Sequence, residues 1–154
     1  MPSTAAGDDA EAQLAGFIDR FDPVIAQRVR DCRTIMRRRF PTAFELVYDN
    51  YQALAIGYAT TDRASDCIVS LAVYPSKIAL SFYYGSAIPD PDGVLQGDGK
   101  QNRFIRLSDA DILNDPKVIK VIHAAVDHGR LPLPADGPGV TIIKSVSANQ
   151  RPRR

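Results

Sequence analysis

The sequence predicts an α+β domain in two layers, with an antiparallel sheet of five to six strands covered by helices from the N-terminal and C-terminal parts. Apolar residues recur at helical spacing before residue 41 and again after residue 115. Between these stretches lie short β-branched and aromatic runs joined by short connections. Parallel pairing would need crossovers of about a dozen residues or more, so the strands are expected to be antiparallel. When helices pack on one face of such a sheet, the apolar residues of the helices and those of the strands are buried against one another.

The N-terminal part predicts two helices. The first is expected over residues 9–22, where apolar side chains follow one face of a helix. Asp22 and Pro23 then form a start signal, an N-cap followed by proline in the first turn, and Pro41 ends the second helix. The arginines of this segment are expected to lie on its exposed surface. The predicted buried positions are Leu14, Phe17, Ile18, Phe21, Ile25, Val29, Cys32, Met36 and Phe40.

The middle and C-terminal parts predict strands, one long loop and a closing helix. Asp115 and Pro116 repeat the helix start signal, and Gly129 is a conventional stop. Residues 140–146 are expected to add an edge strand, followed by a mobile tail. The predicted strands are residues 44–48, 53–58, 67–74, 77–84 and 103–107, the long loop is 85–99, and the closing helix is 116–128.

Length and composition predict one domain. The chain has 154 residues, 45% of them hydrophobic and 24% charged, which is ordinary globular usage. We expect a disordered lead-in over 1–12, the domain over 13–130, and a Pro/Gly linker, a possible edge strand and a basic tail over 131–154. No apolar run approaches the roughly 18 residues needed to span a bilayer, and the N-terminus has no signal-peptide pattern. The two cysteines lack CxxC spacing and are expected to be reduced, so a cytoplasmic protein without membrane contact is predicted.

No motif predicts an enzyme, a cofactor or a known metal site. Counted from Asp90, the sixth and twelfth positions of an EF-hand would be Leu95 and Gln101, so that pattern fails. The chain has neither a GxxxxGK[ST] loop nor a GxSxG elbow. His123 and His128 are five residues apart, about 140° around a helix, and cannot form a zinc pair.

The candidate ligand site is a groove bounded by the long loop. Glu45 stands alone at the start of the first strand, and an exposed glutamate there would be unremarkable. The functional alternative places it at the mouth of a groove with tyrosines, whose apolar rings and polar tips suit binding surfaces. The predicted ligand-binding residues are Glu45, Tyr58, Tyr74, Tyr84, Lys100 and Arg103.

A series of landmarks resembles the YdhG-like family of uncharacterised domains. The landmarks are a leading helix, Pro41 with Glu45, Gly57-Tyr58, Tyr74-Pro75, Gly85, Gly99-Lys100, Arg103 and a closing helix. The resemblance implies a helix-flanked antiparallel sheet close to secretion-chaperone-like domains. One branch of the family is described as frataxin-like iron chaperones, which implies Fe(II) binding by surface carboxylates. The acids available here are Asp90, Asp92 and Asp98 in one loop and Asp109, Asp111 and Asp115 in another, and no metal ligand is assigned.

Three functional hypotheses follow. The leading one is a non-enzymatic binding or chaperone-type domain for a small ligand or a protein partner, as a monomer or homodimer. The first alternative is a frataxin-like iron-binding chaperone. The second is weak nucleic-acid or phosphate binding through residues 20–40, which hold seven arginines and two aspartates, and through the basic tail. The net charge of +1 gives no overall attraction to nucleic acid, so this partner is the least expected.

Overall fold

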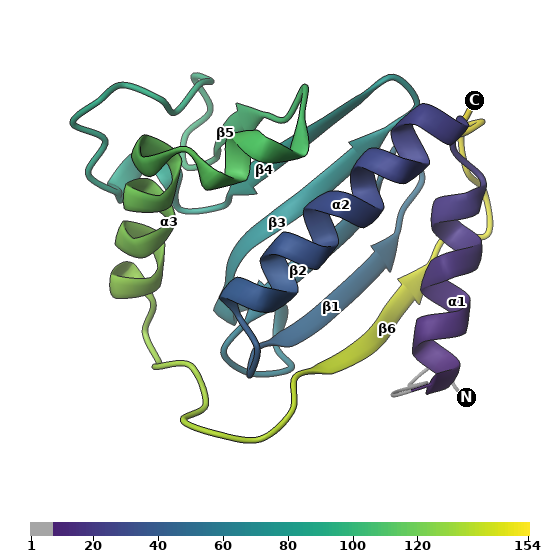
Figure 1. Ribbon diagram of the computed structural model, residues 1–154, viewed down its shortest axis with the longest axis horizontal. Coiled ribbons are helices and arrows are strands. Elements are labelled where there is room, and N and C mark those ends of the chain that lie inside the picture. Colours follow the sequence, from purple (N-terminus) through teal and green to yellow (C-terminus); the bar gives the residue numbers. More distant parts are fainter. Residues whose placement is uncertain (1–7) are drawn as a thin grey trace.

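The computed structural model describes residues 8–154, and this part of the chain forms three α-helices on one face of a six-stranded sheet (Figure 1). The predicted two-layer α+β class is therefore confirmed. The helices are α1 (Asp8–Asp19), α2 (Pro23–Arg39) and α3 (Pro116–His128). The strands are β1 (Phe44–Asp49), β2 (Leu54–Ala59), β3 (Cys67–Tyr74), β4 (Lys77–Phe82), β5 (Arg103–Arg106) and β6 (Val140–Val146). Short 3-10 turns are η1 (Ala64–Asp66), η2 (Gly85–Ala87) and η3 (Ala110–Asn114).

The sheet order is β5-β4-β3-β2-β1-β6. The first five strands form an antiparallel meander, as predicted. The sixth strand is the predicted edge strand, but it pairs parallel to β1, so the expectation of a fully antiparallel sheet is wrong. The reason is the long return from β5 through α3 and residues 129–139, which brings the chain to the opposite edge of the sheet (Figure 1). Such a crossover is what parallel pairing requires.

The core lies between the sheet and the helices. Every residue of the predicted α2 stripe is buried, because its spacing of three and four keeps it on one helix face. In α1, Leu14 and Ile18 are buried and Phe17 is half-buried, and Phe21, just after the helix, is also buried. The helix begins at Asp8, so residues 8–12 belong to it and not to a disordered lead-in. The rest of that predicted lead-in, residues 1–7, lies outside the described residues.

The C-terminal tail is ordered against the body, contrary to the expectation of a mobile segment. The backbone NH of Ser147 donates to Asp49 O at 2.9 Å, and that of Arg151 donates to Tyr51 O at 2.8 Å. Arg153 is only 3% exposed. Its Nη2 donates to the Asp49 carboxylate at 2.9 Å, and its guanidinium lies 5.6 Å from the centre of the Phe21 ring. A buried aspartate at the end of β1 therefore fixes the tail.

Along β1 the two acidic side chains lie on the face of the sheet that the helices cover. Glu45, Val47 and Asp49 face the helices, whereas Leu46 and Tyr48 face the other side, because successive side chains alternate. Two carboxylates thus lie in the layer between the sheet and the helices. No helix in the described part of the chain is long and apolar enough to cross a membrane.

Two glycines give a matched pair of stability predictions. A Cβ at Gly16, in α1, would meet nothing within 4 Å, so Gly16→Ala is expected to stabilise the fold by about 0.5–1 kcal/mol. A Cβ at Gly85 would lie 2.5 Å from the Cβ of Arg103 and 2.9 Å from its backbone nitrogen. Gly85→Ala is expected to destabilise by about 1–3 kcal/mol through overpacking. Urea unfolding of both variants checks the signs, and equal effects would contradict this packing.

Candidate functional site

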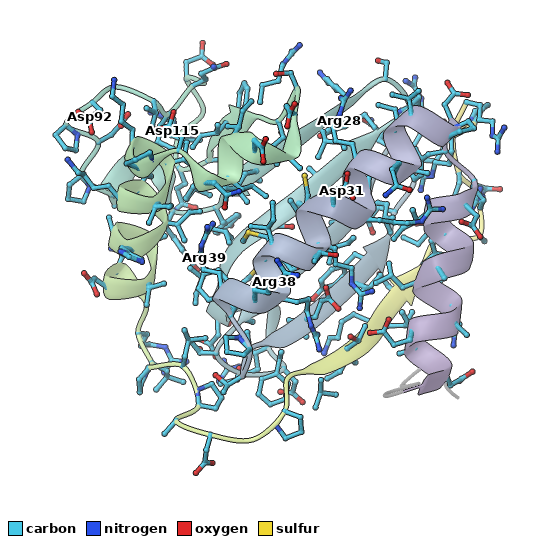
Figure 2. The ribbon with its side chains drawn as sticks, in the orientation of Figure 1. Arg28, Asp31, Arg38, Arg39, Asp92 and Asp115 are labelled. Carbon is cyan, nitrogen blue, oxygen red and sulfur yellow. The ribbon has the colours of Figure 1, made fainter. Side chains whose placement is uncertain are left out.

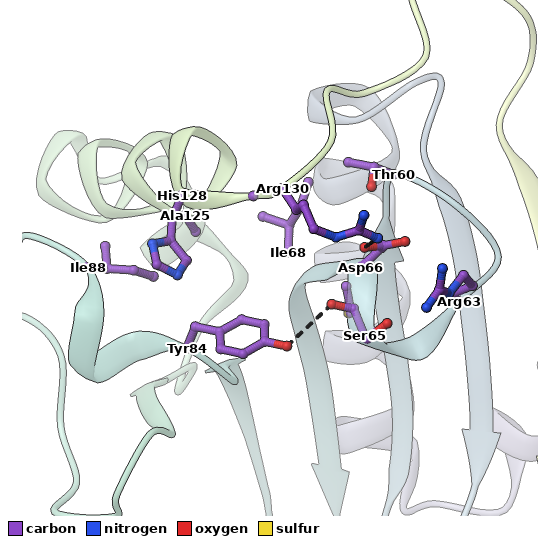
Figure 3. Close-up of a pocket in the computed structure, with 12 residues that line it drawn as sticks. Thr60, Arg63, Ser65, Asp66, Ile68, Tyr84, Ile88, Ala125, His128 and Arg130 are labelled. Carbon is purple, nitrogen blue, oxygen red and sulfur yellow. Dashed lines mark hydrogen bonds and ion pairs between the residues drawn. The ribbon is translucent and has the colours of Figure 1, made fainter.

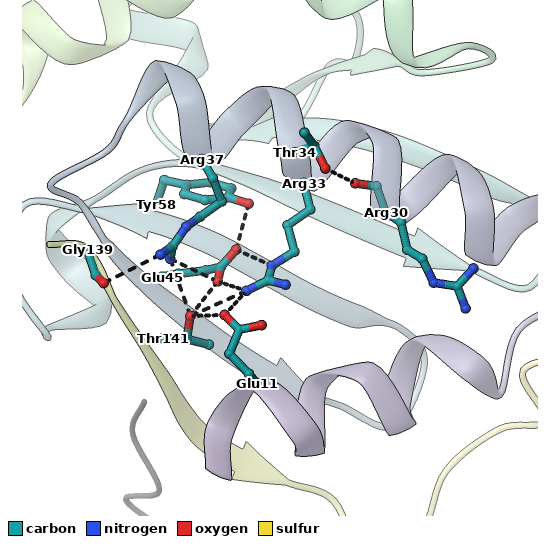
Figure 4. A network of polar contacts seen from close by, with 9 residues as sticks. All are labelled: Glu11, Arg30, Arg33, Thr34, Arg37, Glu45, Tyr58, Gly139 and Thr141. Carbon is teal, nitrogen blue, oxygen red and sulfur yellow. Dashed lines mark hydrogen bonds and ion pairs between the residues drawn. The ribbon is translucent and has the colours of Figure 1, made fainter. Parts of the chain in front are cut away.

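Glu45 is fully buried between β1 and α2 (Figure 4). Arg33 binds its carboxylate through two hydrogen bonds: Nε donates to Oε2 at 2.9 Å and Nη2 to Oε1 at 2.8 Å. Arg37, one turn further along α2, donates from Nη1 to Oε1 at 3.2 Å. Two hydroxyls complete the shell, Tyr58 donating to Oε2 at 2.9 Å and Thr141 to Oε1 at 2.7 Å. The carboxylate is therefore saturated by protein donors.

A second glutamate extends this arrangement to α1. Glu11 pairs with Nη2 of Arg33 and accepts a hydrogen bond from the Thr141 hydroxyl at 3.2 Å. The hydrogen bond from Arg33 lowers the pKa of Glu11 and outweighs its partial burial. We call these residues the Glu45 cluster: Glu11, Arg33, Arg37, Glu45, Tyr58 and Thr141.

Electrostatics within the Glu45 cluster shift the pKa values of Tyr58 and Arg33. Burial, followed by the negative charge of Glu45, raises the pKa of Tyr58 well above its ordinary value, so the phenol remains a donor. Burial alone would lower the pKa of Arg33, but hydrogen bonds to Glu45 and Glu11 raise it. The cluster joins α1, α2, β1, β2 and β6. We conclude that it holds the two layers together and presents no free group to a ligand.

The predicted groove is not formed by the six residues assigned to it. Only Glu45 and Tyr58 meet, and both are fully buried. Tyr74 lies on the opposite face of the sheet, with Nζ of Lys77 5.1 Å from the centre of its ring. Arg103 donates to the carbonyl oxygens of Gly99 and Asn102 within its own loop, and Lys100 is exposed there. Of the six predicted residues, Tyr84 is the one that lines the pocket beside the start of the long loop.

That pocket, which we call the Tyr84 pocket, has a volume of about 300 Å³ (Figure 3). It lies where β2 leads into β3, between η1, η2 and the C-terminal end of α3. Its floor consists of the buried side chains Ile68, Ile88 and Ala125. The remaining lining residues are Thr60, Arg63, Ser65, Asp66, Cys67, Tyr84, His128, Gly129 and Arg130.

The aromatic wall of the Tyr84 pocket is positioned by its neighbours. The Tyr84 hydroxyl donates to Ser65 O at 3.4 Å, across the mouth shown in Figure 3. Its ring centre lies 5.8 Å from that of His128 in a tilted arrangement, and 4.8 Å from that of Tyr83 edge-on. These contacts fall in the range in which aromatic pairs attract one another. The wall is therefore preformed.

The charged wall consists of one ion pair and one additional arginine. Asp66 is buried, and its carboxylate accepts from the Thr61 hydroxyl at 2.7 Å and from Nη2 of Arg130 at 3.1 Å. The hydrogen bond from Thr61, supported by Arg130, lowers the pKa of Asp66. Arg63 is exposed and forms no ion pair with any described residue. The Tyr84 pocket thus has an excess of one positive charge with His128 neutral.

The Cys67 thiol in the Tyr84 pocket is not activated as a nucleophile. Burial raises the pKa of the Cys67 thiol from an ordinary value of 9.0 to about 11. At neutral pH it is protonated, and the thiolate is the reactive form. Cys32 lies on the buried face of α2, and burial raises the pKa of its thiol to about 12. Neither cysteine has the depressed pKa of a nucleophile.

This pKa predicts how stability depends on pH. Between pH 9 and 11 the unfolded chain releases the Cys67 proton while the folded chain retains it, so folding becomes less favourable as pH rises. The contribution is at most about 1.4 kcal/mol per pH unit. Urea unfolding at pH 8, 9, 10 and 11 measures the free energy of unfolding. We expect this free energy to decline less steeply with pH for Cys67→Ala than for the wild type. Identical declines would contradict the raised pKa.

The aspartates considered for iron form local turns and ion pairs. Asp90 accepts from the backbone NH groups of Val94 and Leu95, each at 2.9 Å. Asp92 pairs with Lys120 at 3.4 Å, and Asp115 caps α3; both lie near the amino end of that helix in Figure 2. Across residues 8–154 no three His, Cys, Asp or Glu side chains gather as metal ligands do.

Two arginines of α2, Arg33 and Arg37, are only partly exposed and pair with a buried carboxylate, so the prediction that the arginines of this helix lie on the exposed surface is wrong for these two. Arg33 and Arg37 point toward Glu45. Arg30 pairs with Asp19 at 2.6 Å. A hollow of about 380 Å³ between α1 and α2 is lined by these three arginines, each of which already has a carboxylate partner. Arg38 remains exposed (Figure 2).

Several residues of the Tyr84 pocket were missed from the sequence. Asp66 and Arg130 are 64 positions apart, and no spacing rule joins them. The available signal was composition: residues 60–66 combine Arg63 with Thr60 and Ser65 in a short connection between two strands. For His128 the sequence showed only that its spacing from His123 excludes a zinc pair.

Comparison with known proteins identifies no relative of this chain. The chain matches no family model, no curated protein and no solved structure.

Proposed function

We propose that this protein is a non-enzymatic binding domain whose Tyr84 pocket takes a small organic anion with a compact apolar body. The observation that carries the proposal is the composition of this pocket. It combines a floor of three buried apolar side chains with two arginines, and one of these, Arg63, has no carboxylate partner among the described residues. An apolar cavity with a few convergent polar groups is the usual form of a ligand site.

The size and shape of the pocket support a small ligand. Its volume of about 300 Å³ lies at the lower end of the range for small-molecule sites. The ring of Tyr84 forms one wall, and Ile68 and Ile88 form the floor. A flat body the size of one aromatic ring would contact all three side chains. The exposed Ser65 and the buried Thr60 add hydroxyls to the lining, with which an anionic group could form hydrogen bonds.

The charge balance favours an anion. Arg130 is paired with Asp66, so these two groups nearly cancel. The C-terminal end of α3 adds a partial negative charge, which helix geometry limits to about half a unit. Arg63 contributes a full positive charge to the lining. A guanidinium can bind a carboxylate or phosphate through two parallel hydrogen bonds.

The chemistry of the pocket supports binding rather than turnover. A nucleophile needs a base within hydrogen-bond reach or a lowered pKa. Cys67 has a raised pKa, and Ser65 forms no side-chain hydrogen bond to a histidine or carboxylate among the described residues. The resemblance to the YdhG-like family, whose domains are uncharacterised, is compatible with this role. We propose a cytoplasmic location on composition and cysteine content, with the binding unit acting as a monomer or homodimer.

The test uses four probes that share one ring and differ in charge: benzoate, phenyl phosphate, benzamidine and benzyl alcohol. Calorimetric titration is expected to show saturable binding of the two anions and much weaker binding of the cation and the alcohol. Arg63→Gln is expected to weaken anion binding roughly tenfold or more, because a charge-assisted hydrogen bond contributes about 1.5–3 kcal/mol. Tyr84→Ala is expected to weaken all binding.

Arg38→Gln is the matched control, because Arg38 is an exposed arginine of α2 outside the pocket. It should leave every affinity unchanged. The proposal fails if benzamidine binds as well as benzoate, if none of the four probes binds, or if Arg38→Gln weakens anion binding as much as Arg63→Gln does.

A further inference from the structure

The face of the sheet that the helices leave uncovered has a floor of small side chains. The register places Ser70 opposite Ser81 and Ala72 opposite Ala79, and Ala55 of β2 lies beside Ala72. All five are partly exposed. Larger side chains border this floor: Tyr48 on β1, Tyr74 at the end of β3, Tyr83 after β4 and Phe104 on β5.

Two hollows lie on this floor and meet at Ser81. One has a volume of about 520 Å³ and extends over β3 and β4 to Tyr83 and Ser65. The other, of about 140 Å³, extends over β4 and β5 to Tyr74 and Phe104. We call this continuous depression the β-face trough. It is defined by Ser65, Ser70, Ala72, Tyr74, Lys77, Ala79, Ser81, Tyr83, Phe104 and Arg106.

The charge of the β-face trough has one sign. Lys77 and Arg106 are exposed at the same end of it. No carboxylate lines either hollow among the described residues. Neither cation forms an ion pair within the described part of the chain; Lys77 only lies over the ring of Tyr74. The trough therefore offers a floor of small Ala and Ser side chains, aromatic borders and an unneutralised positive end.

We propose that the β-face trough docks an amphipathic helix of a protein partner, with acidic residues where that helix meets Lys77 and Arg106. Strands lie about 4.8 Å apart, so the three strands β3, β4 and β5 span about 10 Å, close to the diameter of a helix. A floor of Ala and Ser lets the helix approach closely, and Tyr74 and Phe104 flank its apolar face. Opposite charges then set orientation and partner choice.

This inference goes beyond binding at the Tyr84 pocket, because it concerns another face and another class of partner. The trough borders that pocket at Ser65 and Tyr84, so its test uses residues at the far end. Ala72, Lys77 and Arg106 do not line the Tyr84 pocket. Failure of one proposal therefore leaves the other standing.

The probe is a designed helical peptide of about 18 residues, roughly 27 Å long, with Leu and Ala on one face and Glu on the other. Three comparison peptides are used: the same helix with Lys in place of Glu, a scrambled Glu peptide without an apolar face, and a non-helical Pro-containing version. Fluorescence anisotropy is expected to show saturable binding of the acidic helix alone. The variant with Lys77→Glu and Arg106→Glu should weaken it tenfold or more.

A second variant tests the floor. Ala72→Trp fills the trough, and Ala72 is partly exposed outside the core, so circular dichroism and thermal melting should match the wild type. This variant should abolish binding of the acidic helix. Lys120→Glu, a charge reversal on α3, is the matched control and should have no effect.

The proposal is overturned if the scrambled acidic peptide binds equally, since charge alone would then suffice, or if the lysine peptide binds equally. It is also overturned if sedimentation shows a dimer that Ala72→Trp dissociates, because a second copy of the chain would then occupy the trough. Absence of binding by the acidic helix would contradict it directly.

Discussion

Replacing Glu45 with alanine is expected to destabilise the protein by about 3–5 kcal/mol, the cost of removing one partner from a buried ion pair. Glu45 is 0% exposed, and the substitution would leave the Tyr58 hydroxyl and one face of two guanidiniums without acceptors. Arg33 would retain Glu11, but Arg37 has no other carboxylate among the described residues. Urea unfolding followed by circular dichroism measures the change.

Two controls separate this effect from the loss of any surface charge. Glu11→Ala removes the other glutamate of the Glu45 cluster, which is 45% exposed, and should cost about 1 kcal/mol or less. The double variant with Glu45→Met and Arg33→Met removes both partners of the pair that is joined by two hydrogen bonds and should recover part of the lost stability. If Glu45→Ala costs no more than Glu11→Ala, the Glu45 cluster does not hold the layers together.

Arg153→Ala is expected to have the second-largest effect, a loss of about 2–4 kcal/mol. The side chains of Arg153 and Asp49 are each 1% exposed and are joined at 2.9 Å. Without the arginine, Asp49 keeps only Arg20 at 3.4 Å as a cation, and the tail loses its one buried ion pair with the body but keeps its backbone hydrogen bonds. Breaking a buried pair costs several kcal/mol because one charge remains buried. Hydrogen exchange should also accelerate over residues 147–154.

Arg154→Ala is the matched control, because Arg154 is exposed and donates only to backbone carbonyls of Asp19 and Arg20. It should change stability by less than about 1 kcal/mol. Equal effects of the two variants would mean that the tail contributes through its overall charge and not through the buried pair. Nε and Nη1 of Arg153 lack partners among the described residues, so the double variant with Arg153→Met and Asp49→Asn should be more stable than Arg153→Ala.

The helices and the strand order of the meander could be predicted because each depends on local signals. The α2 stripe and the Asp115-Pro116 start are cases in which spacing and capping chemistry decide the structure. The parallel pairing of β6 could not be predicted, since it depends on where residues 129–139 carry the chain. The order of the tail depends on Asp49 and Arg153, which are 104 positions apart.

The position of Glu45 on β1 could not be predicted from the alternation of side chains. Alternation suggests that Phe44, Leu46 and Tyr48 face the core and that Glu45 faces solvent. In the structure Glu45 faces the helices, where Arg33 and Arg37 neutralise it, and Leu46 lies on the opposite face and is also buried. A clue existed in the sequence. Each of these arginines follows a buried stripe residue by one position, which places it at the edge of the buried helix face.

The Tyr84 pocket shows what a sequence can and cannot reveal about a binding site. Of the six residues predicted for a groove beside the long loop, Tyr84 lines this pocket, and Ile88 of that loop forms part of its floor. The partners of Tyr84 come from residues 60–68 and 125–130, and only the tertiary fold brings these segments together. Ion pairs between distant segments, such as Asp66 with Arg130, leave no periodic signal.

The most direct test of the central proposal is a ¹⁵N-labelled NMR titration with benzoate, read residue by residue. We expect shifts that saturate together and cluster on residues 60–68, 84–88 and 125–130, which line the Tyr84 pocket. The same cluster should be absent in Tyr84→Ala. Shifts centred on α2, or no saturable shifts at all, would contradict an anion site in the Tyr84 pocket.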